Sequence, residues 1–250
     1  MKIKISFTKG FSVFAIGFLL VGCQTSNTSE EESPANESSV SSTAETESST
    51  VPESSSGLQE QTTGSHVHDE ETEQIYAGYF EDSEVKGRSL SDWEGDWQSV
   101  YPYLQDGTLD EVFSYKAEHE GDMTSEEYKK YYSEGYRTDV DRVVIDENTV
   151  TFFKDGEEYS GEYVDNGYEI LTYDAGNRGV RYSFKLAEEV EGLPHYIQFS
   201  DHSIYPYEAD HYHLYWGDDR EKLFAEVINW PTYYPSEMDG HDIAHEMMAH

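Results

Sequence analysis

Three histidines in one short stretch are the residues most suited to chemistry. The stretch from Tyr196 to Trp216 reads YIQFSDHSIYPYEADHYHLYW and contains His202, His211 and His213. Side chains alternate faces along a strand, so His211 and His213 should point the same way. Residues 205–210, which lie between His202 and this pair, form a plausible hairpin connection that would bring His202 opposite the pair. We therefore predict three imidazoles on one face of two adjacent strands.

Such a group predicts a zinc site. Three protein ligands with an open fourth position are typical of zinc when water or another group completes the tetrahedron. Neutral imidazoles suit Zn²⁺, although Cu²⁺ or Ni²⁺ could compete for them. The alternative is structural, because a histidine in a strand is usually a surface residue or a hydrogen-bonded core residue. A His-x-His pair also arises by chance, and it is the third histidine that favours the metal site.

Two further histidines lie upstream, at His66 and His68, and three acids follow them at 69–71. This pattern suggests a flexible arm that collects metal ions. Incidental polarity is the other interpretation, and the second histidine group downstream favours the metal-binding one.

The C-terminus resembles a zincin motif but does not satisfy it. His245 and His250 in HEMMAH are five residues apart, whereas the zincin histidines need a spacing of four to share a helix face. We therefore exclude a metalloprotease. His241 and His245 have that spacing and could hold a metal on a helix surface. The flanking Asp242 and Glu246 favour a solvated helix face instead.

The first 22 residues are predicted to be a signal peptide. A lysine-containing start precedes the apolar run 11–21, which is too short for a comfortable membrane span. The run ends in LVGC, which resembles the bacterial lipobox. We therefore expect Cys23 to be lipidated and to anchor the exported chain to the membrane. Because it is the only cysteine, no internal disulfide can form.

Composition divides the rest of the chain into three parts. Residues 23–65 are rich in Ser, Thr and Glu, with no aromatic residue, and predict a disordered tether. Residues 66–74 form the histidine and acidic arm, and residues 75–250 form one folded domain. The formal charge is −36, and loss of the three lysines in residues 1–22 makes it −39. Such acidity argues against nucleic acid and anionic lipid as partners, and it favours cations.

The domain is predicted to be mainly β with flanking helices. Alternating, tyrosine-rich segments predict strands at 140–145, 149–154, 158–163, 168–173, 180–186, 196–199 and 211–216. Residues that favour turns separate the predicted strands at 146–148, 154–156, 165–167 and 175–177. Helices are predicted at 109–117, 125–136, 221–228 and 239–250, the second starting with a capping box of Thr124 and Glu127. Short turns imply an antiparallel meander that closes into a barrel.

Several segments together resemble the ZinT (YodA-like) family, which also forms the C-terminal domain of some Gram-positive zinc-binding lipoproteins. These segments are RSLSDWEGDWQSVYPYL, GYEILTY, GVRYSF, YIQFSDHSIYPYEADHYHLYWGDD, NWPTYYP and EMMAH. The resemblance implies a lipocalin-like (calycin) barrel outside the cytoplasm that binds zinc, cadmium and related ions. It also implies that the metal ligands are His202, His211 and His213.

The leading functional hypothesis is a lipoprotein that captures Zn²⁺ and passes it to the solute-binding protein of an ABC importer. The first alternative is a zinc-dependent hydrolytic enzyme, in which a bound water becomes the nucleophile. No distinctive catalytic partner is visible, so we expect a binding protein rather than an enzyme. The second alternative is a lipocalin-type carrier of a small ligand.

Overall fold

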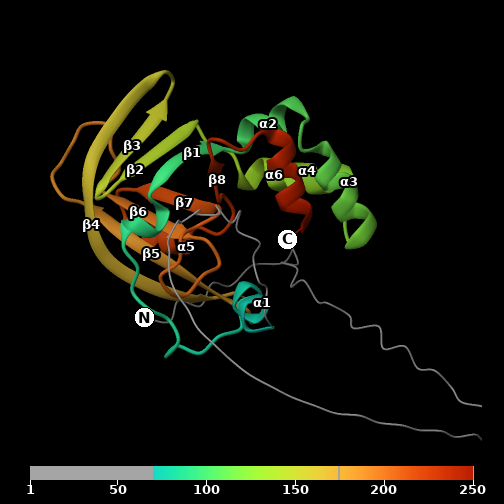
Figure 1. The fold of residues 1–250 in the computed structure, drawn as a ribbon, viewed down its shortest axis with the longest axis horizontal. Coiled ribbons are helices and arrows are strands. Elements are labelled where there is room, and N and C mark those ends of the chain that lie inside the picture. The colour runs from blue at the N-terminus through green and yellow to red at the C-terminus, as the bar shows by residue number, and fades with distance from the viewer. Residues whose placement is uncertain (1–69, 174, 250) are drawn as a thin grey trace, which may run out of the picture. The chain divides into compact units, whose positions relative to one another are not determined.

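A computed structural model describes residues 70–173 and 175–249 (Figure 1). Eight strands form a closed barrel in sequence order, each antiparallel to its neighbours, and the last strand pairs with the first. The predicted antiparallel barrel is confirmed. The strands are β1 (Gly95–Ser99), β2 (Arg142–Asp146), β3 (Thr149–Lys154), β4 (Glu157–Thr172), β5 (Arg178–Leu186), β6 (Tyr196–Ser200), β7 (Tyr212–Gly217) and β8 (Thr232–Pro235).

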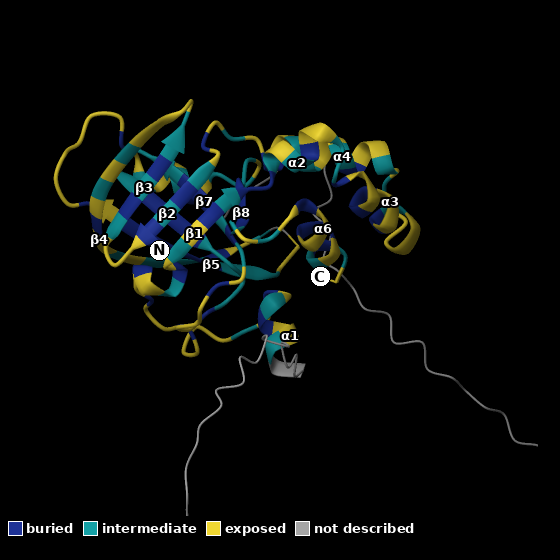
Figure 2. Cartoon of the chain, turned by 45° about the horizontal axis from the view of Figure 1, so that its top comes forward, coloured by how far each residue is buried: buried dark blue, intermediate teal, exposed yellow. Residues whose placement is uncertain are grey.

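The barrel forms because its strands alternate between apolar and polar residues. Buried residues alternate with more exposed ones along β2 and β3 (Figure 2). Their inward side chains join an aromatic core that includes Trp93, Tyr163 and Phe199, none of them exposed. Closing the sheet removes its free edges, which would otherwise present unpaired backbone groups.

The long strand β4 differs from the prediction of two strands. It runs through residues 165–167, where the sequence indicated a turn, and its pairing register shifts between Asp165 and Tyr168. Gly167 has a positive φ of 77°, and its N–H donates to the Asp165 carboxylate. The turn-favouring residues 165–167 therefore form a β-bulge within β4 instead of a turn between two strands. A hairpin is absent because the first half of β4 pairs with β3 and the second half with β5.

The helices gather beside the barrel around a second apolar core (Figure 1). They include α2 (Tyr101–Asp106), α3 (Asp110–His119), α4 (Ser125–Gly135) and α6 (Gly240–Ala249). The capping box of Thr124 and Glu127 is present at the start of α4, as predicted. The described helices include none long and apolar enough to cross a bilayer.

Four short elements differ from the sequence prediction. Helix α5 (Arg220–Ala225) ends three residues earlier than expected, and α2 was not anticipated. Strand β8 follows the Trp230-Pro231 pair directly, and the sequence did not predict it. The described part of helix α1 (Glu70–Tyr76) overlaps the segment assigned to the flexible arm. The other three elements have six residues or fewer, too short for a period to be recognised.

Trp230 connects the barrel to the helices. Its backbone N–H donates to the carbonyl of Gly135 at 2.7 Å, and its ring packs against Tyr132 and Tyr136 of the α4 region. The neighbouring Asn229 side chain donates to three carbonyls at the end of α4, including that of Gly135. Because Trp230 precedes β8 directly, this contact fixes the helices against the strand that closes the barrel.

Gly135→Ala should therefore destabilise the fold. A Cβ at this position would lie 2.3 Å from the Trp230 ring, so the ring must move. Alanine usually favours a helix over glycine, but overpacking costs about 1–3 kcal/mol. Urea unfolding would measure the loss. Gly87→Ala is the control, because its Cβ would meet nothing within 4 Å. Equal stability of the two variants would contradict a tight contact at Gly135.

Candidate metal centre

The three predicted histidines are brought together, although only one of them lies in a strand. His213 is in β7, opposite Ser200 of β6 and Thr232 of β8. His211 immediately precedes β7, and His202 follows the end of β6 by two residues. His202 thus lies near the other two histidines, as predicted, but it belongs to the loop after β6 and not to a strand. His202 has a φ of 65°, in the left-handed region that few residues other than glycine adopt.

Alternation along β7 sets the direction of His213. Its neighbours Tyr212 and Leu214 are fully buried in the barrel core. His213 must therefore point out of the barrel, towards the helices, where its ring meets Trp230 with centroids 5.6 Å apart.

The three rings surround one centre. Their centroids are 5.4 Å apart for His202 and His213, and 6.1 Å apart for each of the two pairs that include His211. The Nε2 atoms of His202 and His213 are 3.3 Å apart. Zinc–nitrogen bonds of about 2.0–2.1 Å at tetrahedral angles place two ligand nitrogens about 3.3–3.4 Å apart. The separation of this pair therefore suits zinc.

The third ring is slightly too far away for a closed shell. Two imidazoles on one tetrahedral zinc have ring centres about 5.2 Å apart, so His211 must move inward by several tenths of an ångström. In agreement with this, no three His, Cys, Asp or Glu side chains among residues 70–173 and 175–249 are placed so that they could hold a metal ion as they stand.

Hydrogen bonding determines which nitrogen of His213 carries the proton. Its Nδ1 lies 2.8 Å from the hydroxyl of Thr232, and that hydroxyl donates to the carbonyl of Trp230 at 3.0 Å. The hydroxyl has one proton, so it must accept from Nδ1–H. Nε2 then keeps its lone pair directed at the other rings, the arrangement that orients a metal-binding histidine. Burial, followed by His202, His211 and Arg181, holds the pKa of His213 well below its ordinary value.

Each histidine also contacts an aromatic ring. Tyr76 of α1 stacks on His202 with centroids 4.4 Å apart, and Tyr234 of β8 stacks on His211 at 5.1 Å. Trp230 meets His213 edge to face. Burial raises the pKa of Tyr76 to about 12, so its phenol is neutral near pH 7. The imidazole orientations are therefore supported by packing as well as by hydrogen bonds.

A buried ionic network holds the loop that carries His202. The Arg88 guanidinium contacts the Asp201 carboxylate at 2.6 Å and the Asp92 carboxylate at 2.7 Å, and it donates to the Tyr207 carbonyl at 2.8 Å. The Arg88 side chain is completely buried, and that of Asp201 is 3% exposed. Trp93 adds an indole N–H bond to Asp201 at 3.1 Å. Because Asp201 precedes His202, this network restrains its left-handed backbone.

Comparisons with known proteins identify the family. Residues 71–250 match the family described as ZinT (YodA) periplasmic lipocalin-like zinc-recruitment. The chain belongs to the ZinT family. The predicted family and the lipocalin-like fold are both confirmed.

Relatives include both a full-length and a partial match. The probable metal-binding protein YrpE of Bacillus subtilis (strain 168) is 68% identical over 259 residues, covering 99% of this chain and 100% of YrpE. Zinc-binding protein AdcA of Streptococcus pyogenes serotype M3 is 54% identical over 183 residues, covering 72% of this chain. This chain spans only 36% of that AdcA.

A solved structure shows the same fold. The Zn(II)-bound ZinT-like domain of Streptococcus pneumoniae AdcA matches with a TM-score of 0.68 at 50% identity, covering 70% of this chain and 97% of that domain. These ZinT relatives are named for zinc or metal binding, and the family is one of binding proteins rather than enzymes.

The other histidines considered for metal binding are not part of this group of three. His241 is 85% exposed and lies 3.3 Å from Glu111 of α3, and His245 is exposed on α6. His66, His68, His250 and the predicted lipid-bearing Cys23 lie outside the described residues.

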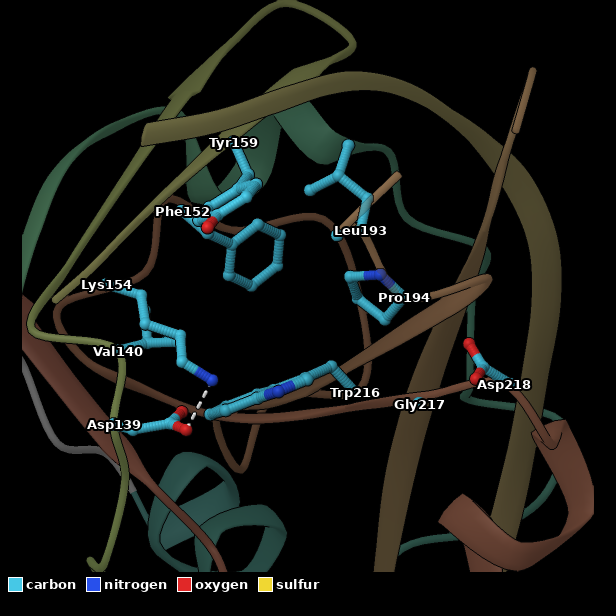
Figure 3. Close-up of a pocket in the computed structure, with 11 residues that line it drawn as sticks. Asp139, Val140, Phe152, Lys154, Tyr159, Leu193, Pro194, Trp216, Gly217 and Asp218 are labelled. Carbon is cyan, nitrogen blue, oxygen red and sulfur yellow. Dashed lines mark ion pairs between the residues drawn. The ribbon is translucent and has the colours of Figure 1, made fainter. Parts of the chain in front are cut away.

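A separate cavity of about 410 Å³ lies at the other end of β7. Figure 3 shows Trp216, Phe152 and Pro194 bordering it, with the Lys154–Asp139 ion pair at one side. None of the three histidines lines it. A small-ligand carrier within this ZinT fold would thus use a site separate from the triad.

Sequence reasoning missed the residues that orient the triad. Thr232 and Trp230 lie in the NWPTYYP segment that carried the ZinT resemblance, but nothing in their types indicated a contact with His213. Arg88 and Tyr76 are more than 100 residues from the histidines along the chain. Only an alignment of ZinT relatives could have linked them.

Arg88→Met should destabilise the fold strongly. Removing one partner leaves the buried Asp201 carboxylate uncompensated, which typically costs about 3–5 kcal/mol. Arg142→Met is the matched control, because Arg142 and its partner Asp96 are 43% and 44% exposed. That variant should stay close to the wild-type free energy of unfolding. Urea titration compares them, and similar losses in both would contradict a structural role for the Arg88 network.

Proposed function

We propose that this chain binds one Zn²⁺ ion through His202, His211 and His213. The observation that carries the proposal is the convergence of three rings on one centre, with Nε2 atoms of two of them 3.3 Å apart. The Thr232 hydroxyl supports it by leaving the Nε2 lone pair of His213 available.

The three imidazole ligands determine which metal ion binds and how readily it exchanges. Three neutral imidazoles give a borderline site that suits Zn²⁺, and Cd²⁺, Cu²⁺ or Ni²⁺ can compete for it. The open fourth position takes water or a group from an acceptor. Such a site suits capture and transfer, because an acceptor ligand can bind before the histidines release the ion.

Replacing His211 and His213 together by alanine should abolish tight zinc binding. Two of three ligands are then lost, and one imidazole cannot hold the ion against water. Isothermal titration calorimetry with zinc measures the affinity. His241→Ala is the control, because this exposed histidine lies outside the triad, and it should bind zinc as the wild type does. Unchanged affinity in the double variant would refute the site.

We further propose that the chain acts in zinc acquisition while anchored outside the cytoplasm through Cys23. Two observations support this proposal. The cysteine follows an apolar run in a lipobox-like LVGC, and the related AdcA of Streptococcus pneumoniae is named a zinc-binding lipoprotein. Zinc would pass from the triad to the solute-binding protein of an ABC importer. Residues 23–65 would serve as the tether and residues 66–74 as an arm that helps to collect zinc.

Cys23→Ser should move the protein from the membrane fraction to the growth medium. Without a thiol, no acyl chain can be attached, and nothing else in this proposal holds the chain to the bilayer. Cells carrying this variant should also need more zinc for growth in chelated medium. Fractionation and a zinc titration of growth measure both effects. Retention in the membrane would refute the anchor, and unchanged zinc demand would refute the need for tethering.

A further inference from the structure

The cavity bordered by Trp216 opens at one end of the barrel. Side chains alternate along a strand, so Trp216 faces the barrel interior with the buried Leu214, and Phe152 of β3 does so with the buried Val150. Lys154, the last residue of β3, shares the facing of Phe152. Beyond the rings of Phe152 and Trp216 lies a hollow of about 410 Å³ (Figure 3). Ligand pockets typically have about 300–1,000 Å³, so this hollow can hold a small molecule.

We propose that this cavity binds a small organic cation, in which an ammonium group is attached to an apolar body. Three aromatic side chains border it, those of Phe152, Tyr159 and Trp216. The rings of Phe152 and Trp216 have centroids 6.2 Å apart and planes inclined by 59°, so they form a corner. Aromatic faces attract cations, and several rings around one space are typical of sites for substituted ammonium ions. The proposal goes beyond zinc binding and does not depend on it.

The charges at the rim favour a cation over an anion. Among the described residues that line the cavity, the acids Asp139 and Asp218 outnumber the one base, Lys154. The Lys154 ammonium is already bound to the Asp139 carboxylate at 2.5 Å, whereas the Asp218 side chain is 76% exposed. Figure 3 shows the Lys154–Asp139 pair and Asp218 on opposite sides of Trp216. The formal charge of −36 on the whole chain also draws cations towards it.

The wall of the cavity formed by the loop between β5 and β6 is fixed before any ligand arrives. The carbonyl of Pro194 accepts the hydroxyl of the buried Tyr163 at 2.8 Å. Gly192 has a φ of 89°, and a Cβ there would lie 2.7 Å from the Tyr159 ring. The loop therefore lies directly against β4. A ligand enters a cavity whose wall is already ordered, so binding does not bear the entropic cost of ordering it.

The test is an NMR titration of the full ¹⁵N-labelled chain with benzyltrimethylammonium chloride at constant ionic strength. The indole N–H signal of Trp216, assigned through Trp216→Phe, should shift and saturate. Phenylacetate and benzyl alcohol keep the aromatic body but carry a negative charge and no charge, respectively. Both should bind about fivefold or more weakly, because the attraction between the cation and the rings is absent.

Two lysine variants separate a local effect from the net charge of the chain. Lys154→Met should tighten binding of the ammonium about two- to fivefold, because Asp139 is then free to pair with it. Lys129→Met is the matched control, since the Lys129–Asp110 pair on the helices is similarly exposed, at 39% and 56% against 41% and 58%. It removes the same charge and should leave the affinity unchanged. Both lysines lie at the surface, so neither variant should prevent folding.

Four results would overturn the proposal. Absence of a saturating shift at the Trp216 indole would exclude a ligand site in this cavity. Tighter binding of phenylacetate would assign the cavity to anions, and equal binding of benzyl alcohol would make it merely apolar. Equal gains in Lys154→Met and Lys129→Met would reduce the charge effect to that of the whole chain. Zinc takes no part in these titrations, so their outcome is separate from that of the His211 and His213 calorimetry.

Discussion

The position of β7 between β6 and β8 is the constraint on which the rest of the site depends. Tyr212 and Leu214 are buried inside the barrel, and burying a leucine side chain contributes about 1.5–3 kcal/mol. A shift of one residue in register would expose both and turn His213 into the core. The hydrophobic energy of the barrel therefore sets the direction of an imidazole that contributes nothing to that core itself.

The outward direction of His213 gives it a particular environment. The ring enters the space between barrel and helices, where Trp230 and Thr232 contact it. Burial there lowers its pKa, which keeps the imidazole in the neutral form that metals require. The same contact between Trp230 and Gly135 that joins the two cores also places an aromatic edge against this ring. Trp230 therefore contributes both to the stability of the fold and to the orientation of His213.

The loop with His202 combines strain with strong restraint. A non-glycine residue in the left-handed region costs about 1–3 kcal/mol and persists only when its surroundings determine it. Here Arg88 contacts Asp201 before the histidine and the Tyr207 carbonyl after it. One triad ring is thereby held by a charged network, and the ring of Tyr76 from α1 stacks on it.

The sequence by itself determined the barrel class, most strands and the candidate triad. Alternation with period two predicts strands locally, and the spacing of His211 and His213 places both on one side without knowledge of any partner. The tertiary structure alone decided the remaining features. Strand β4 continues through a turn-like segment because β3 and β5 pair with its different halves, and β8 exists because β1 and β7 both pair with it. Thr232, Trp230, Tyr76 and Arg88 reach the histidines only through contacts distant in sequence, and such contacts leave no local pattern for a sequence to show.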